Sequence, residues 1–146
     1  MGHASQIALT IALQHPEQRI WCLDGDGAVL MHMGGMAIIA NSEANNLVHV
    51  VLNNGAHDSV GGQPTVGLSI DIAKIASAMG YKQTYTMTSN TELTKVLNQI
   101  KEASGPILIN ILVRKGNRPD LGRPTTTPIQ NKQAFMAEIN KSNDEA

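Results

Sequence analysis

Short apolar runs alternate with segments of helical periodicity along most of this 146-residue chain. The apolar runs contain many β-branched residues, which favour strands, and the segments between them repeat apolar residues every three or four positions, which favours helices. The predicted strands are 19–25, 46–54, 82–87 and 106–113, and the predicted helices are 5–13, 28–41, 72–79, 89–100 and 131–139. This alternation predicts the α/β class, with a parallel sheet and helices on both of its faces.

Further predictions concern the first strand of the domain and its C-terminal segment. The run at 19–25 is nearly continuous in apolar residues, as in a strand that is covered on both faces. The first helix begins almost at residue 1, whereas a doubly wound domain usually begins with a strand, so we expect the fold to lack its first strand. We predict one domain over 1–146, in which the Pro- and Thr-rich segment 114–130 is irregular and precedes a final short helix.

Charge and composition argue against several classes of partner. The chain has 11 Lys and Arg and 12 Asp and Glu without a basic block, so neither nucleic acid nor an anionic membrane is an expected partner. No run approaches the ~20 apolar residues of a membrane span. The single cysteine, Cys22, lies in an apolar run, which is typical of a buried, reduced thiol. We therefore expect a cytoplasmic location rather than a secreted scaffold.

Two polar, glycine-rich turns follow the first two predicted strands. The first turn is "DGDG" at 24–27, and the second is "NNGAHDS" at 53–59. Because parallel strands present their carboxyl ends at one edge of a sheet, both turns are predicted to open on the same side. Asp26 and Asn54, 28 positions apart, could then face each other across one site, while Asp24 is explained as a turn residue.

The chemistry of these turns suits a hard cation and a phosphate group. Magnesium takes carboxylate, amide and backbone carbonyl oxygens, which Asp26, Asn54 and a nearby carbonyl could supply. The amides of Gly27 and Ala28, at the start of the next helix, suit phosphate oxygens. The alternative is that both turns are ordinary connections that glycine permits. A P-loop motif and zinc-ligand spacings are both absent.

The segment "GDGAVLMHMGGMAIIANSEANNLVHVVLNN" resembles the cofactor motif of the thiamin-diphosphate enzymes, which begins with GDG and ends with NN. The resemblance implies a thiamin-diphosphate-binding fold in which Mg²⁺ is held by Asp26, Asn54 and the backbone carbonyl of Ala56. It also implies that the backbone at Gly27 and Ala28 supports the diphosphate. The predicted cofactor-binding residues are Gly25, Asp26, Gly27, Ala28, Asn54, Ala56, His57, Asp58 and Ser59.

A narrower resemblance covers residues 1 to about 136. The stretches "MGHASQIAL", "LDGDGAVLMHMG", "LNNGAHDSVGGQPT" and "DLGRPTTTPIQNK" are similar to the C-terminal pyrophosphate-binding domain of the phosphonopyruvate decarboxylase family. This implies a thiamin-diphosphate-dependent carboxy-lyase that converts a 2-oxo acid, phosphonopyruvate, to phosphonoacetaldehyde and CO₂. The alternatives are a sulfopyruvate decarboxylase, an acetolactate-synthase-like subunit, and a non-catalytic domain of this fold.

The same resemblance implies partners. In that family a pyrimidine-binding domain or subunit supplies the glutamate that activates the cofactor, and none of this chain's glutamates is assigned that role. We therefore expect a homo- or hetero-oligomer, and we expect the chain alone to be inactive.

Several other polar side chains have two interpretations. His57 is the candidate catalytic residue, as a donor to the substrate or a proton shuttle, although it could instead hold a loop in place. His3 is a weaker candidate on the cofactor side. Arg118 and Arg123 could meet a phosphonate or simply form solvated ion pairs. His15 is predicted to face solvent, and His32 and His49 are predicted to be packing or surface residues.

Overall fold

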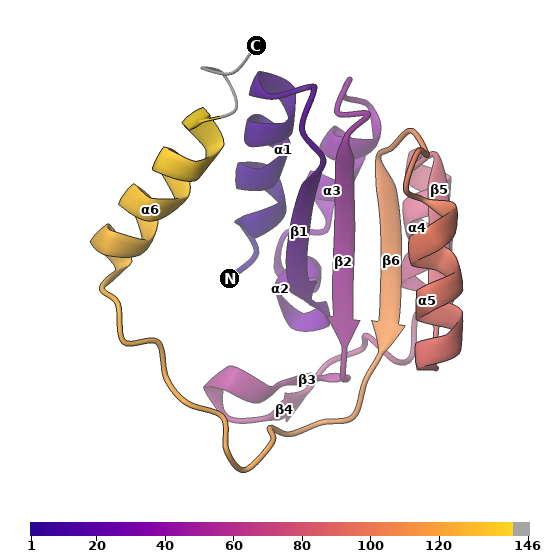
Figure 1. Ribbon diagram of the computed structural model, residues 1–146. Coiled ribbons are helices and arrows are strands. Elements are labelled where there is room, and N and C mark those ends of the chain that lie inside the picture. Colours follow the sequence, from indigo (N-terminus) through magenta and orange to yellow (C-terminus); the bar gives the residue numbers. More distant parts are fainter. Residues whose placement is uncertain (142–146) are drawn as a thin grey trace. The chain divides into compact units, whose positions relative to one another are not determined.

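The computed structural model describes residues 1–141, and the chain divides into two compact units, Met1–Gly116 and Asn117–Ala146. The first unit is built on a four-stranded sheet in the order β1-β2-β6-β5, in which every pairing is parallel (Figure 1). Its elements are α1 (Ala4–Gln14), β1 (Ile20–Gly25), α2 (Asp26–Met31), α3 (Gly34–Ala40), β2 (Leu47–Asn53), β3 (Ala56–His57), the 3-10 helix η1 (Asp58–Val60), β4 (Gln63–Pro64), α4 (Ile72–Met79), β5 (Gln83–Met87), α5 (Asn90–Gln99) and β6 (Ile107–Leu112). The predicted α/β class and parallel sheet are confirmed.

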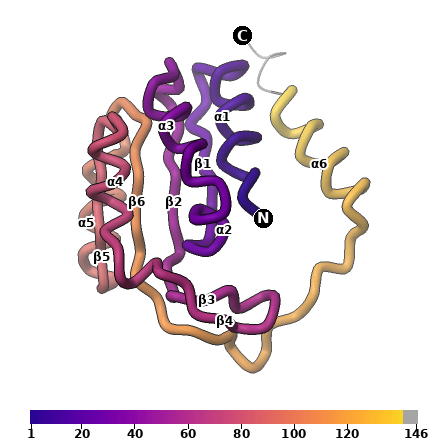
Figure 2. Tube along the Cα trace, turned by 180° about the vertical axis from the view of Figure 1, so that it is seen from behind, coloured from indigo at the N-terminus to yellow at the C-terminus, as the bar shows by residue number. Residues whose placement is uncertain are grey.

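Helices pack on both faces of this sheet, as predicted. Alternate residues of β2 point to opposite faces, so Leu47 and Val51 belong to one apolar cluster and Val48 and Val50 to another. The first cluster contains the buried residues of α1, α3 and α4, and the second contains those of α5. Seen from behind, α1, α2 and α3 are grouped along β1 and β2 (Figure 2). The core therefore lies in two layers, one on each side of β2 and β6.

The predicted single helix over 28–41 is wrong, because the chain forms two helices there. The first helix, α2, ends at His32, whose φ of −136° and ψ of 47° are not helical. The second, α3, then brings Gly35 against Gln6 of α1, whose side-chain amide donates to the Gly35 carbonyl at 3.0 Å. A Cβ at Gly35 would lie 2.5 Å from that amide nitrogen. The break at His32 thus allows α3 to approach α1 closely. A continuous stripe of apolar residues in the sequence does not show where such a break occurs.

The prediction that β1 is covered on both faces is also wrong for the described residues. Cys22 packs in the first apolar cluster, but Trp21 and Leu23, on the opposite face of β1, are 45% and 68% exposed. The reason is that β1 is an edge strand, and α5 packs over the other end of the sheet, where it contacts β5. The expectation of an absent first strand stays a prediction.

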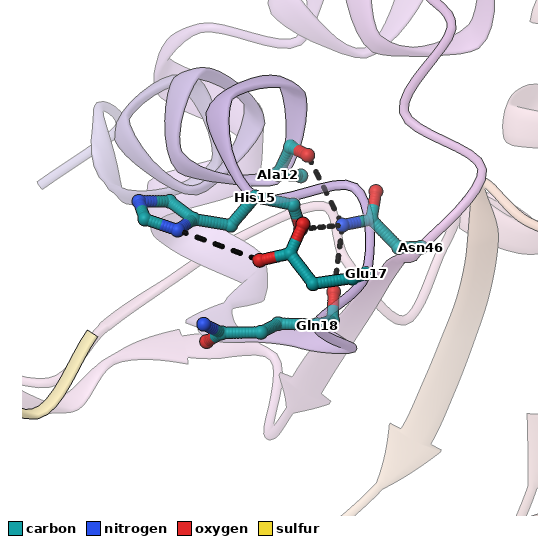
Figure 3. A network of polar contacts seen from close by, with 5 residues as sticks. All are labelled: Ala12, His15, Glu17, Gln18 and Asn46. Carbon is teal, nitrogen blue, oxygen red and sulfur yellow. Dashed lines mark hydrogen bonds and ion pairs between the residues drawn. The ribbon is translucent and has the colours of Figure 1, made fainter. Parts of the chain in front are cut away.

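The side chain of a single asparagine stabilises the connection between α1 and β1. The side-chain amide of Asn46 donates to the carbonyls of Ala12, His15 and Gln18 at 3.0, 2.8 and 2.7 Å (Figure 3). His15 lies in this turn with its Nδ1 3.8 Å from Glu17 Oε1, and its side chain is only 13% exposed. The prediction that His15 faces solvent is therefore wrong, because its side chain is largely buried in the turn that follows α1.

The ends of α4 and α5 follow the capping signals of the sequence. Asp71 caps α4 by accepting from the Lys74 amide, and Gly80 ends that helix in the left-handed conformation with φ of 110°. Ser89 and Glu92 form a capping box at the start of α5, as predicted.

The second unit contains the helix α6 (Pro128–Lys141). This helix begins inside the segment 114–130 that was predicted to be irregular, because Thr127 and Gln130 exchange side-chain and backbone hydrogen bonds and Pro128 suits a first helical position. Arg118 pairs with Asp120 at 3.2 Å between exposed side chains. Residues 142–146 of the predicted domain lie outside the described residues. Within residues 1–141 no helix has the length and apolar character needed to cross a bilayer.

Candidate cofactor site

A cavity of about 580 Å³ lies at the carboxyl ends of β1 and β2. Its volume is within the range of small-molecule sites. In Figure 1, β2 and β6 end beside the β3–β4 hairpin, which follows β2 in the chain. The cavity is lined by the first residues of the chain, the β1–α2 turn and the segment after β2: Met1, Gly2, His3, Ala4, Ile7, Leu23, Asp24, Gly25, Asp26, Gly27, Ala28, Leu52, Asn54, Ala56, His57, Asp58 and Ser59. All nine predicted cofactor-binding residues are in this set.

Asp26 is the first residue of α2 and is almost fully buried, with 1% of its surface exposed. One carboxylate oxygen accepts from the backbone amide of Asn54 at 3.3 Å, and the other accepts from the hydroxyl of Thr65. The predicted juxtaposition of Asp26 and Asn54 across 28 positions is therefore present. Within residues 1–141 no basic side chain forms an ion pair with Asp26. A buried carboxylate without a charged partner is costly, so this site favours a cation.

The two asparagines that end β2 have different surroundings. Asn53 is fully buried, donates from its side chain to the Gly67 carbonyl at 2.7 Å and accepts from the Gly55 amide at 3.2 Å. Asn54 is partly exposed and lines the cavity. Asn53 therefore holds the loop, and Asn54 is the asparagine whose amide is available to a ligand.

His57 lies against the start of α2. A Cβ added at Gly27 would overlap the imidazole ring, with Nδ1 and Cε1 as its nearest atoms. Nδ1 is buried and has no hydrogen-bond partner within the described residues. The position of Gly27 thus needs glycine because an aromatic ring packs directly on its Cα. The contact places His57 beside the helix start where the sequence predicts the diphosphate.

Thr65 and Gly67 are parts of the site that the sequence reasoning missed. Thr65 reaches Asp26 from 39 positions away, and a Cβ at Gly67 would lie 2.5 Å from Asp26 Oδ2. They directly follow the antiparallel pair β3–β4 in the chain. This hairpin returns the chain over the β1–α2 turn. A pairing as short as two residues on each strand leaves no periodic signal in a sequence.

A buried polar cluster lies in the sheet next to the cavity. Asp24 Oδ2 is 3.5 Å from His49 Nε2, and His49 Nδ1 is 3.3 Å from the Tyr81 hydroxyl. The prediction that Asp24 is a turn residue is wrong, because Asp24 lies within β1, pairs with Val51 of β2 and is a buried partner of His49. Burial, and secondarily the Asp24 carboxylate, raises the pKa of the nearby Cys22 thiol to about 11. Cys22 is therefore the buried, protonated thiol that its apolar surroundings predicted.

His3, His32 and His49 have different surroundings. His3 precedes α1, lines the cavity and stacks on His32, with ring centroids 4.4 Å apart. His32 is exposed at the end of α2, and His49 is buried in the sheet, as the packing-or-surface prediction allows.

Comparisons with known proteins agree on one family. The family model described as "Thiamine pyrophosphate enzyme, C-terminal TPP binding domain" matches residues 1–111. The chain is 39% identical to a phosphonopyruvate decarboxylase from Streptomyces viridochromogenes, covering 95% of this chain and 35% of that protein. It is 35% identical to the sulfopyruvate decarboxylase subunit beta from Methanothermobacter thermautotrophicus, covering 80% of this chain and 60% of that subunit. The chain thus spans about a third of the phosphonopyruvate decarboxylases that it matches.

A solved structure supports the same assignment. The chain aligns with a Mycobacterium smegmatis protein described as a thiamin diphosphate-dependent enzyme, with a TM-score of 0.61 and 25% identity over 78% of this chain and 21% of that one. Together with the family match, this shows that the chain belongs to the C-terminal, thiamine pyrophosphate-binding domain family of the thiamine pyrophosphate enzymes.

Proposed function

We propose that this chain binds the diphosphate of thiamin diphosphate (thiamine pyrophosphate) through Mg²⁺ and serves a 2-oxo acid decarboxylase whose substrate is phosphonopyruvate. The observation that carries the proposal is the buried Asp26 carboxylate, which shares a cavity with Asn54 and has no basic partner within residues 1–141. The similarity to phosphonopyruvate decarboxylases supports the choice of substrate.

The side chains and backbone groups of the cavity fit a Mg²⁺ ion and the diphosphate that it would bind. Asp26, the side-chain oxygen of Asn54 and the carbonyl of Ala56 would hold the metal, and they are the oxygen ligands that Mg²⁺ prefers. The backbone at Gly27 and Ala28 would support the diphosphate, because the first amides of a helix lack intrahelical partners. The absence of a side chain at Gly25, where a Cβ would meet nothing within 4 Å, would let the diphosphate approach this backbone closely.

The remaining predicted residues would act on the substrate side. Thiamin diphosphate, when bound, supplies the electron sink that a 2-oxo acid needs to lose CO₂. His57 would donate a hydrogen bond to the phosphonate or move a proton, since the nitrogens of an imidazole can donate or accept a hydrogen bond. Asp58 and Ser59 would form the adjoining wall of the cavity.

The proposal includes a second domain or subunit that holds the aminopyrimidine. Two observations support it: the chain spans about a third of its phosphonopyruvate decarboxylase relatives, and three sulfopyruvate decarboxylase relatives are named as beta subunits. The complete enzyme would then be a homo- or hetero-oligomer, and we propose a cytoplasmic location for it.

Calorimetric titration with thiamin diphosphate, with and without Mg²⁺, tests the proposal. We expect binding that requires Mg²⁺. Asp26→Asn keeps the shape of the side chain but removes its charge, so it should weaken Mg²⁺-dependent binding at least about tenfold. Asp120→Asn makes the same chemical change at an exposed residue of the second unit and should bind as the parent chain does.

Binding that is indifferent to both Mg²⁺ and Asp26→Asn would contradict the cofactor proposal. The substrate is tested separately, by comparing CO₂ release from phosphonopyruvate, sulfopyruvate and pyruvate in the assembled enzyme. A preference for sulfopyruvate would favour the second candidate, which the 35% identity to a sulfopyruvate decarboxylase subunit supports.

A further inference from the structure

We infer that Asp58 is a positioning residue that orients the side-chain amide of Asn54, so that the amide oxygen is the atom presented to the metal. This inference rests on the proposed function, in which Asn54 is a metal ligand. It assigns Asp58 a role through Asn54 instead of a direct contact with the cofactor.

The two ends of the Asn54 amide have chemically different partners. The NH₂ group donates to Asp58 Oδ2 at 3.1 Å, and the oxygen accepts from the Ala56 backbone amide at 3.0 Å. A carboxylate only accepts, so it can meet only the NH₂ end, and a backbone N–H can meet only the oxygen end. Both contacts therefore select the same one of the two orientations that an amide can adopt.

This orientation matters because only one end of an amide can bind a cation. The oxygen of Asn54 has two lone pairs, of which the Ala56 amide uses one. The other is free for a hard cation, whereas the NH₂ group has none to offer. A flipped amide would therefore turn a ligand into a group that repels the metal.

Asp58 is itself held by a distant part of the chain. The same oxygen, Oδ2, accepts from the backbone amide of Gly116 at 2.7 Å, just beyond β6. One residue earlier, the ammonium of Lys115 donates to the Gly62 carbonyl at 2.5 Å. These two contacts join the segment after β6 to the turn that begins at Asp58. The carboxylate that orients Asn54 is thus held by the segment after β6 as well as by its own loop.

The changes Asp58→Ala and Asp58→Asn together test this role. Asp58→Ala removes the oxygen that accepts from both Asn54 and Gly116, so the Asn54 amide loses the partner that selects its orientation. In Asp58→Asn, the new side-chain oxygen can take the place of Oδ2 and accept from both donors, while the negative charge is removed. We expect the affinity for the metal to fall about tenfold or more in Asp58→Ala, the usual loss when a partner of a metal ligand is removed, and Asp58→Asn to retain most of the affinity.

The full 146-residue chain is titrated with Mn²⁺ at a fixed concentration of thiamin diphosphate, and free Mn²⁺ is measured by electron paramagnetic resonance against a protein-free blank. Mn²⁺ prefers the same oxygen ligands as Mg²⁺. The titration is repeated in ~1 M salt, where screening acts over about 3 Å and a loss caused only by the removed charge would shrink. We expect the loss in Asp58→Ala to persist there. Thermal unfolding of each metal-free variant checks that it is folded at the temperature of the titration.

Asp71→Ala is the matched control, because Asp71 also accepts from a backbone amide but does not line the cavity. It should leave Mn²⁺ binding unchanged. If Asp58→Ala binds Mn²⁺ as the parent chain does, if its loss disappears in salt, or if Asp58→Asn loses as much affinity as Asp58→Ala, the role of Asp58 is overturned and the proposed function stands. If the parent chain itself shows no cofactor-dependent Mn²⁺ binding, both proposals are overturned.

Discussion

At the scale of single residues, two glycines of the same turn have opposite requirements. A Cβ at Gly27 would overlap the ring of His57, whereas a Cβ at Gly25 would meet nothing within 4 Å. Neither glycine has a positive φ, so backbone conformation does not distinguish them. The difference between them is one of packing alone.

We predict that Gly27→Ala destabilises the fold by about 1–3 kcal/mol, the usual cost of overpacking. This exceeds the gain of up to ~1 kcal/mol that alanine brings inside a helix. Gly25→Ala should cost less than about 1 kcal/mol, because Gly25 only precedes the helix. Chemical denaturation measures both free energies of unfolding. Equal costs for the two variants would show that His57 moves aside freely.

At the scale of secondary-structure elements, the connection between α1 and β1 depends on one side chain from a distant position. Asn46 precedes β2, yet its amide satisfies three carbonyls of the turn that ends α1. The last carbonyls of a helix have no intrahelical donor, so their partners must come from elsewhere. Asn46 therefore couples the end of α1 to the start of β2.

Asn46→Ala should lower the free energy of unfolding by about 1–3 kcal/mol, because it removes the three partly buried hydrogen bonds that join the end of α1 to the start of β2. Asn41→Ala is the control: its amide bonds the carbonyl of Ala37 four residues earlier, at an exposed helix end, so its loss should cost less than about 1 kcal/mol. Thermal unfolding followed by circular dichroism compares the two. A loss from Asn46→Ala no greater than that from the control would mean that water replaces the amide in the turn.

At the scale of the whole molecule, the site is open on one side. The cavity is lined by aspartates, asparagine and histidines, and no glutamate from residues 1–141 takes part in it. Apolar side chains at its rim, Ile7 and Leu23, are 61% and 68% exposed. A surface of this kind beside a cofactor site fits contact with another domain.

We therefore predict that the purified 146-residue chain, supplied with thiamin diphosphate and Mg²⁺, releases no CO₂ from phosphonopyruvate. The physical reason is that the chain would hold the diphosphate but not activate the aminopyrimidine. A coupled assay for CO₂ measures this directly, with Mg²⁺-dependent cofactor binding as the positive control for a folded site. Release of CO₂ by the chain alone would contradict the proposal that a second domain is required.

Parts of the fold and the site could be predicted because their signals are local. The strands β1, β2, β5 and β6 lie within a residue or so of their apolar runs, since side-chain alternation and β-branching act over neighbouring positions. The end of α4 at Gly80 and the start of α5 at Ser89 were equally predictable, whereas the cap at Asp71 was not predicted. The juxtaposition of Asp26 and Asn54 followed from a general rule of parallel sheets and needed no knowledge of side-chain packing.

The sequence by itself thus determined the α/β class and the polar segments at one edge of the sheet. Only the tertiary structure decided that Thr65 holds Asp26, that the Gly116 amide holds Asp58, and that β1 leaves Trp21 and Leu23 uncovered. It also decided that the helix after Asp26 breaks at His32. The physical reason is distance along the chain: hydrogen bonds and close packing between residues tens of positions apart depend on where the whole backbone goes, and no local pattern encodes them.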